Sequence, residues 1–451
     1  MAESTSAPSP KGPSASNFAT TGAIALQTLR SEPGVPVRRW SSRAHTLDEI
    51  ERELGKLWAG PPGAVPAGED AERHVAARTS VLNLVVIARR PEIGQRAAAA
   101  ISELTGRHPS RTMILLPRDP DGPSGLDATI EAYCVVPSEQ AAETCAELIH
   151  LSAGGEAGRH LEALVAPLLI HDLPVTMWWP SEPIFGTSQS ERLIAMSDRL
   201  VVDSSGWSGS GMARLAELAR IAPRVTICDF AAIRQSRWRE AIASTFDLPE
   251  FLPFLRSIRR IAVTYSTHDQ DGDPEGTNIV KPIYHVAWLA SRLGMHVDRG
   301  LHPAPRSRRP VTRPTTRPTG SGPRTVPGGF DAMLRDHRSG EVSVVLRPVL
   351  FGVPAGTTLR VELLADRRGQ ELRIDVTAEA DYVHVGVWLN GVEMVQRHFS
   401  APRLTEVDLL AETIELGGPD PVASAALTMA RALIAGPPEP VHHENEPGGD
   451  R

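Results

Sequence analysis

The feature that most constrains the fold of this chain is a regular alternation of short apolar runs with amphipathic segments between residues 81 and 293. VLNLVVIA (81–88) and RTMILLP (111–117) have the composition of strands that are buried on both faces. Between them, Pro91 stands where a first helical residue belongs, and an alanine-rich stretch ends at Gly106. The order strand, helix, strand predicts parallel strands joined by a crossover helix.

The alternation continues along the chain. We expect further strands at 127–136, 174–179, 199–205, 224–230 and 259–265. We expect further helices at 46–59, 140–151, 160–170, 190–196, 212–221, 234–245 and 279–293. The sequence therefore predicts an α/β domain over 31–300, built on a doubly wound, largely parallel sheet.

The pattern changes after residue 300. Residues 301–329 are rich in proline, threonine and arginine without acidic residues, which predicts a linker; its arginines form a solvated spacer or, as the alternative, a docking strip for an acidic partner. Residues 330–437 combine strand-like runs, two of them joined around Asn390-Gly391, with two C-terminal helices. They predict a smaller α+β domain with an antiparallel sheet. Residues 1–30 and 438–451 are predicted to be disordered tails.

Composition excludes several classes of protein. A chain of 451 residues exceeds the usual size of one hydrophobic core, and its formal charge of −7 gives no general attraction to nucleic acid or to anionic lipid. No apolar run approaches the roughly 18 to 20 residues that a membrane helix needs, and the N-terminus is a poor secretory signal. Three cysteines, Cys134, Cys145 and Cys228, without metal-type spacing favour a reducing compartment. We expect a cytoplasmic protein that binds neither membrane nor nucleic acid.

The stretch HDLPVTMWWPSEPIFG (171–186) places two tryptophans side by side at the end of a predicted strand. Trp178 and Trp179 are either core residues or, because rigid aromatic side chains supply contact area at low entropic cost, part of a recognition surface. The carboxyl ends of strands border the crevice of an open α/β sheet. We therefore expect at least one ring to be partly exposed, and Trp179, next to Pro180, to be the one.

The stretch VVDSSGWSGSGMARL is the most enzyme-like in the chain. Asp203, Ser204, Gly206, Gly209 and Gly211 lie between a predicted strand and a predicted helix, where anions can bind to free backbone amides. The glycine spacing differs from the dinucleotide fingerprint, and the lysine of a phosphate loop is missing. The stretch is therefore either an ordinary flexible loop or an anion-binding loop.

Other candidate sites are weaker. Asp269, Asp271, Asp273 and Glu275 alternate as in a calcium loop, but the sixth position is proline and the twelfth is valine, so we expect a solvated acidic loop without metal. His442-His443 lies in the predicted tail. There is no G-x-S-x-G elbow, and no cysteine has an obvious local base. The residues specify no reaction, which favours a binding or regulatory role and leaves no catalytic residue to name.

Six runs, taken together, resemble one family, the glucose-6-phosphate dehydrogenase assembly proteins known as OpcA. These runs are RTSVLNLVV (78–86), RHPSR (107–111), HDLPVTMWWP (171–180), SDRLVVDSS (197–205), SRWREAIASTFD (236–247) and HVAWLASRLGM (285–295). They occur in the order that the family has, and the strand-rich C-terminal part resembles the family's second domain. The N-terminal 30 residues and the arginine-rich linker carry no such likeness.

The resemblance implies a non-catalytic partner that assembles or activates glucose-6-phosphate dehydrogenase in the oxidative pentose phosphate pathway. It implies no cofactor for this chain, since NADP belongs to the dehydrogenase. Candidate partner-binding residues are Trp178, Trp179, Pro180, Trp238 and Arg239. Redox control is associated with photosynthetic members of the family, but we expect the three cysteines here to be buried small hydrophobes. The alternative function is an enzyme or sensor that binds a phosphorylated small molecule at the Gly206–Gly211 loop.

Overall fold

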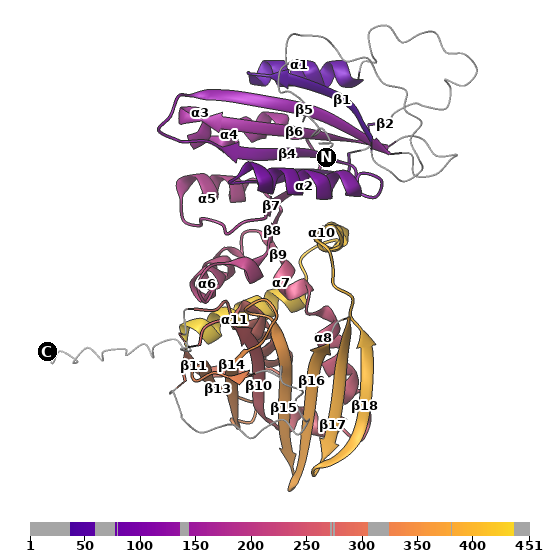
Figure 1. The fold of residues 1–451 in the computed structure, drawn as a ribbon, viewed down its shortest axis with the longest axis vertical. Coiled ribbons are helices and arrows are strands. Elements are labelled where there is room, and N and C mark those ends of the chain that lie inside the picture. Colours follow the sequence, from indigo (N-terminus) through magenta and orange to yellow (C-terminus); the bar gives the residue numbers. More distant parts are fainter. Residues whose placement is uncertain are drawn as a thin grey trace, which may run out of the picture.

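The computed structural model of the chain contains two large β-sheets, one above the other in Figure 1. It describes residues 37–58, 77–78, 80–135, 144–270, 273, 276–304, 324–379 and 381–436. The tails predicted at 1–30 and 438–451, and most of the linker predicted at 301–329, lie outside the described residues.

The first sheet is largely parallel and has the strand order β1-β5-β6-β4-β3-β7-β8-β9, with β2 paired to β6. Its strands are β1 (Val37–Ala44), β2 (Ala77–Arg78), β3 (Leu82–Ile87), β4 (Ser110–Pro117), β5 (Gly125–Val135), β6 (Thr144–Gly154), β7 (Val175–Trp179), β8 (Arg199–Val202) and β9 (Thr226–Asp229). Only the pairs β1–β5 and β5–β6, at one edge, are antiparallel. The carboxyl ends of β3, β7, β8 and β9 therefore lie along the same edge of the sheet.

Helices and short 3-10 turns connect these strands. They are α1 (Leu47–Trp58), α2 (Pro91–Leu104), α3 (Gly155–Arg159), α4 (Leu161–Val165), η2 (Ala166–Leu168), α5 (Ser188–Ala195), η3 (Ser204–Gly206), α6 (Met212–Ile221) and α7 (Phe230–Ile233). Strand periodicity sends alternate side chains to opposite faces of the sheet. On β3, Leu84 and Val86 pack in one apolar cluster with α2, while Val85 and Ile87 pack in a second cluster on the other face. Burial on both faces explains the largely apolar composition of β3.

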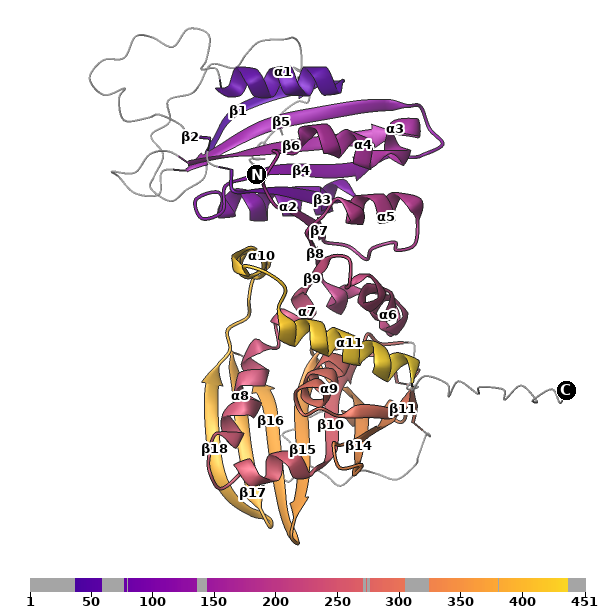
Figure 2. The same ribbon diagram turned by 180° about the vertical axis from the view of Figure 1, so that it is seen from behind.

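The second sheet is largely antiparallel, with the order β11-β13-β14-β10-β15-β16-β17-β18 and with β12 paired to β14. Its strands are β10 (Ile258–Thr267), β11 (His296–Pro303), β12 (Arg324–Thr325), β13 (Phe330–Arg335), β14 (Glu341–Leu350), β15 (Thr358–Arg367), β16 (Gln370–Glu379), β17 (Tyr382–Leu389) and β18 (Val392–Ser400). The pair β10–β14 is parallel. Figure 2 shows α8 (Ser236–Phe246), α9 (Val280–Arg292) and α11 (Pro421–Ala435) on one face of this sheet; the 3-10 turn η4 (Leu252–Ser257) precedes β10.

A C-terminal helix, α10 (Glu406–Glu415), ties the two parts of the chain together. It follows the second sheet in sequence but packs against α2 of the first, and Leu409 and Leu410 lie in the same apolar cluster as Trp178. Figures 1 and 2 both show α10 next to the lower side of the first sheet. The cluster on the opposite face of the first sheet is also continuous with the core under α9 and α11. The two sheets therefore share their hydrophobic core.

The mixed α/β class is confirmed, with one largely parallel and one largely antiparallel sheet. The exact winding of helices around the first sheet stays a prediction, as does the division into independently folding domains. One assignment was wrong: the strand predicted at 259–265 was placed with the first sheet, but β10 lies between β14 and β15 of the second. β11 likewise begins before the predicted boundary at residue 300. Local sequence cannot identify a strand's neighbours, because both of β10's neighbours lie about 80 to 100 residues further along the chain.

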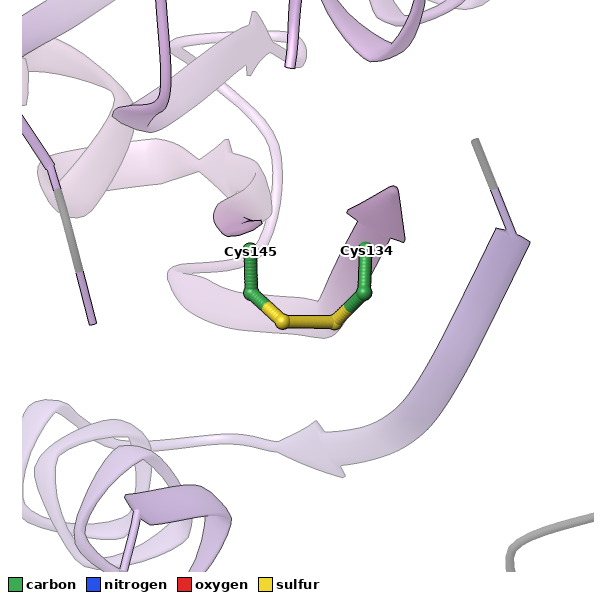
Figure 3. Close-up of a disulfide and its surroundings, with 2 residues drawn as sticks. All are labelled: Cys134 and Cys145. Atoms are coloured by element: carbon green, nitrogen blue, oxygen red, sulfur yellow. A yellow bond between two sulfur atoms is a disulfide. The ribbon is translucent and has the colours of Figure 1, made fainter. Parts of the chain in front are cut away.

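The helix predicted at 140–151 was also wrong. Its described part belongs to β6, which pairs with β5 on one side and β4 on the other. Alanine, glutamate and leucine favour a helix locally, but pairing on both edges overrides that weak preference. In this register Cys145 lies directly opposite Cys134, and the two form a disulfide with Cα atoms 4.1 Å apart (Figure 3). The expectation of three unpaired cysteines was therefore wrong for this pair, while Cys228 is free and buried.

Candidate functional site

Both tryptophans of the WW pair are core residues. Trp178 is 0% exposed and Trp179 is 5% exposed, on opposite faces of β7. The Trp178 ring lies 6.3 Å from that of Phe230, at the start of α7. The expectation that Trp179 is partly exposed was wrong. The reason lies in the loop after β7, which folds back over the ring.

Phe185 of that loop completes an aromatic row at the carboxyl ends of β7 and β8. The ring of Phe185 lies 6.3 Å from Trp179 and 6.5 Å from Trp207, with both pairs edge to face. All three rings are buried. The edge of an open α/β sheet at which ligands usually bind is here packed with side chains of the protein itself.

The other predicted partner-binding residues lie elsewhere. Pro180 is partly buried and follows β7, whereas Trp238 and Arg239 belong to α8, which covers β16, β17 and β18. Trp238 is 8% exposed, and its ring packs against that of His285 at 5.1 Å. The five residues therefore form no common surface. Sequence reasoning selected aromatic residues, and in this chain these three tryptophans stabilise the core.

The predicted anion-binding residues do lie together, as a group at the carboxyl end of β8. Both carboxylate oxygens of Asp203 accept hydrogen bonds from the Arg234 guanidinium, at 2.8 and 2.9 Å. The backbone amide and hydroxyl of Ser208, inside the Gly206–Gly211 loop, both donate to Glu182, at 3.0 and 2.8 Å. Gly209 and Gly211 have φ values of 60° and 76°, so their glycine character serves the turn. The Glu182 carboxylate already accepts hydrogen bonds from these two loop donors. The geometry therefore does not favour an external anion at this loop.

A buried carboxylate, missed by the sequence analysis, organises the same edge. Asp229 ends β9, is buried, and receives hydrogen bonds from the Ser204 hydroxyl, the Ser204 amide, the Ala231 amide and the Tyr284 hydroxyl. Burial raises its pKa to about 6, although the hydrogen bonds from Ser204 oppose that shift. The signal available in sequence was its place at a strand end directly before α7, where it caps the Ala231 amide.

Three groups next to this network have no such partners. Lys281 and His285 lie one turn apart on α9, and Arg239 lies on α8. Lys281 and Arg239 are partly buried, and within the described residues their charged groups have no hydrogen-bond or ion-pair partner. His285 is buried, and both of its ring nitrogens lack a hydrogen-bond partner. We call these three residues the α8–α9 basic cluster.

Neither a metal-binding group nor a membrane-spanning helix is present in the described part of the chain. No group of three or more histidine, cysteine or acidic side chains there is arranged to hold a metal ion. Asp271 and Glu275 of the acidic loop, and His442-His443, lie outside the described residues. No described helix is long and apolar enough to cross a membrane.

Comparison with solved structures gives only distant likenesses. An NAD-binding oxidoreductase from Klebsiella pneumoniae has a TM-score of 0.43 at 11% identity, over 79% of this chain and 96% of that one. The transcriptional regulator Gal80p from Kluyveromyces lactis has a TM-score of 0.41 at 11% identity, over 82% and 95%. These values carry no argument about function.

Two sequence relatives are proteins with the provisional name OxPP cycle protein OpcA. That of Nostoc punctiforme is 29% identical over 194 residues, and that of Synechocystis sp. is 27% identical over 192 residues. Each match covers 42% of this chain, and it spans 39% and 38% of the relatives' own lengths.

Two family models match consecutive parts of the chain. The glucose-6-phosphate dehydrogenase subunit N-terminal domain matches residues 101–220, and the C-terminal domain of the same subunit matches residues 225–427. Together they account for well over half of the chain, which therefore belongs to the OpcA family of glucose-6-phosphate dehydrogenase subunits.

Proposed function

We propose that this chain is a non-catalytic assembly factor or allosteric activator that binds glucose-6-phosphate dehydrogenase and acts in the cytoplasm, in the oxidative pentose phosphate pathway. One observation carries the proposal. Both domain models of the dehydrogenase subunit match, in order and almost without a gap, over residues 101–427. The names of the relatives from Nostoc punctiforme and Synechocystis sp. point to the same pathway.

The geometry of the first sheet supports the non-catalytic part of the proposal. The carboxyl ends of β7 and β8 are packed with the rings of Trp179, Phe185 and Trp207. The nearby loop amide of Ser208 donates to Glu182. A substrate or dinucleotide at this edge would have to displace buried aromatic side chains, which costs several kcal/mol. In this proposal the chain needs no cofactor of its own, and NADP belongs to the dehydrogenase.

An activator must bind two states of its partner with different affinities, whereas an assembly factor needs only to bind. The test therefore measures both association and kinetics with the cognate dehydrogenase. We expect the two proteins to co-elute at micromolar concentrations, and the chain to raise kcat or lower KM for glucose 6-phosphate. The chain alone should reduce no NADP.

Each outcome decides part of the proposal. Co-elution without a kinetic effect leaves only the assembly role. NADP reduction by the chain alone contradicts the non-catalytic role. The absence of both co-elution and a kinetic effect contradicts the whole proposal. Heat-unfolded chain at the same concentration is the control for non-specific protein effects.

A further inference from the structure

The second sheet has helices on one face only. α8 and α9 contact its strands on the side where Val361, Ile374 and Val385 lie, and these residues belong to the shared hydrophobic core. Figure 1 shows the opposite side toward the viewer, and no helix of the described chain covers it. We call this opposite side the open face; its outward side chains include Met333, Val345, Leu364, Arg360, Asp375 and Trp388. A face that merely meets water should carry polar side chains.

The open face instead carries apolar side chains at its centre. Met333, Val345 and Leu364, on β13, β14 and β15, are partly exposed and belong to neither apolar cluster of the core. Between β14 and β15 lies Ala262 of β10, which is 1% exposed and pairs directly with Val345. Leu364 pairs with Arg260, two positions away from Ala262 on β10. An apolar surface with a polar rim is typical of an interaction site.

A tryptophan continues this surface on β17. Arg373 of β16 pairs with Leu364 on one side and with Trp388 on the other, so the three lie in one row across the sheet. The Arg373 guanidinium stacks over the Trp388 ring, 4.2 Å from its centroid. The same ring lies against Gly386, where it leaves no room for a Cβ atom. A partly exposed ring that is already held in place loses little entropy on binding, and tryptophan and arginine are enriched among residues that dominate interfaces.

The charged side chains of the open face neutralise one another. Arg360 pairs with Asp375 at 2.6 Å and with Glu362 at 3.0 Å, and Arg373 lies 3.7 Å from Asp375. A two-fold contact places the same patch on both sides of the interface, so a face with charges of one sign would repel its own copy. Pairing within the open face removes that repulsion. The charge distribution therefore suits a second copy of this chain.

The size of the open face also fits a stable dimer. Strands lie about 4.8 Å apart and rise about 3.3 Å per residue, so eight strands of 6 to 10 residues cover roughly 1,000 Å². A specific protein interface of standard size buries about 800 Å² on each partner. The open face therefore has enough area for such an interface without any contribution from the first sheet.

We propose that two copies of this chain form a homodimer through the open face, with the sheets packed face to face about a two-fold axis. The apolar residues Met333, Val345 and Leu364 form the centre of the contact, and Trp388 is an anchor beside them. The paired charges of Arg360 and its partners stay within each copy. The proposal concerns the chain alone, so it does not rest on the function proposed above.

Sedimentation velocity and light scattering on the full chain measure its oligomeric state. At micromolar concentrations we expect a mass of twice the 48.6 kDa of the chain. Leu364→Arg should weaken dimerisation at least about 100-fold, because it buries an unpaired charge on each side of the two-fold axis. Trp388→Ala should weaken it about 10- to 100-fold, the usual effect of removing an anchoring ring.

The matched control is Val392→Arg, an apolar-to-arginine substitution in the same sheet. Val392 is 63% exposed and pairs with Leu389, which packs against the core on the helix-covered side. It therefore lies away from the open face, and its replacement should leave dimerisation unchanged. Circular dichroism of each variant shows whether the fold is retained.

A second measurement needs no variant. Hydroxyl-radical footprinting with mass spectrometry compares the oxidation of side chains in dilute and in concentrated protein. We expect oxidation of Met333 and Trp388 to fall as the concentration rises through the range of dimerisation. Trp40, a partly exposed tryptophan on β1 of the first sheet, is the internal control and should be oxidised equally at both concentrations.

Four results would overturn the proposal. The first is a monomer at micromolar concentrations with equal oxidation of Trp388 throughout. The second is a dimer that Leu364→Arg and Trp388→Ala leave unchanged, since it would use another surface. The third is a monomer whose binding to the dehydrogenase Leu364→Arg weakens, which would assign the open face to that enzyme. The fourth is protection of Trp388 at every concentration that is lost when residues 305–323 are replaced by a glycine-serine segment, which would mean that the chain covers its own open face.

Discussion

Arg199, the first residue of β8, donates from its guanidinium to the backbone oxygen of Thr413, 214 residues further along the chain. A second hydrogen bond from the same guanidinium reaches the oxygen of Leu416, so Arg199 caps the C-terminal end of α10. Cations are favourable at this end of a helix because its last carbonyl groups are unsatisfied. A residue of the first sheet thereby binds α10, which follows β18 of the second sheet in sequence.

Replacing this cap should loosen α10. We expect Arg199→Met to lower the free energy of unfolding by about 1.5 to 3 kcal/mol, the usual contribution of hydrogen bonds from a charged group. Denaturant unfolding followed by circular dichroism measures it. Arg220→Met, at an exposed position of α6, is the control and should change stability by less than about 0.5 kcal/mol. Equal effects of the two substitutions would contradict a capping role.

Two of the sequence runs that carry the family resemblance supply side chains that contact α10. Arg107 and His108 of RHPSR both lie within ion-pair distance of Glu415, at 2.5 and 3.2 Å, and Arg199 belongs to SDRLVVDSS. Nothing in the spacing of these runs indicates contacts with a helix some 200 to 300 residues away. The sequence therefore located these residues without predicting what they do.

Elements specified by local chemistry could be predicted. The apolar runs of β3, β4, β7, β8 and β9 are confirmed as strands, and Asn390 and Gly391 adopt φ values of 50° and 81° in the hairpin between β17 and β18. Elements decided by distant partners could not. β6 is a strand because β4 and β5 flank it, and the Trp179 ring is buried because Phe185 folds back over it. The α8–α9 basic cluster also depends on packing between two helices that local patterns cannot bring together.

The burial of both tryptophans leads to a direct test. We expect Trp178→Ala and Trp179→Ala each to lower the free energy of unfolding by about 3 to 5 kcal/mol, since each removes a large buried ring. Ile184→Ala lies in the same loop at 46% exposure and is the control, with an expected loss below about 0.5 kcal/mol. A Trp179 variant with unchanged stability but weaker dehydrogenase binding would restore the recognition role that the sequence suggested.

The Cys134–Cys145 disulfide should contribute to stability by restricting the unfolded chain. The two residues are 11 apart in sequence, and closure of so short a loop is worth about 3 kcal/mol in the chain-entropy model. Dithiothreitol should lower Tm of the wild-type chain and of Cys228→Ser alike. It should have no effect on a Cys134→Ser, Cys145→Ser double variant, which already lacks the bond. A thiol titration that counts three free cysteines in the untreated chain would contradict the bond itself.

Asp229 should make stability depend on pH. Its pKa in the folded protein is raised to about 6, from an ordinary value of 3.8, chiefly by burial. Between these two values the folded state binds more protons than the unfolded state, so the contribution of Asp229 is fully present below about pH 3.8 and is lost as pH rises through 6. The loss is on the order of 3 kcal/mol.

The test compares the free energy of unfolding of the wild type with that of Asp229→Asn, measured by denaturant unfolding at several pH values. The difference between the two removes the contributions of the other carboxylates. We expect that difference to fall by this amount between pH 4 and 7 and to stay level above it. A difference that rises over the same interval would mean that the hydrogen bonds from Ser204, Ala231 and Tyr284 outweigh burial and hold Asp229 ionised.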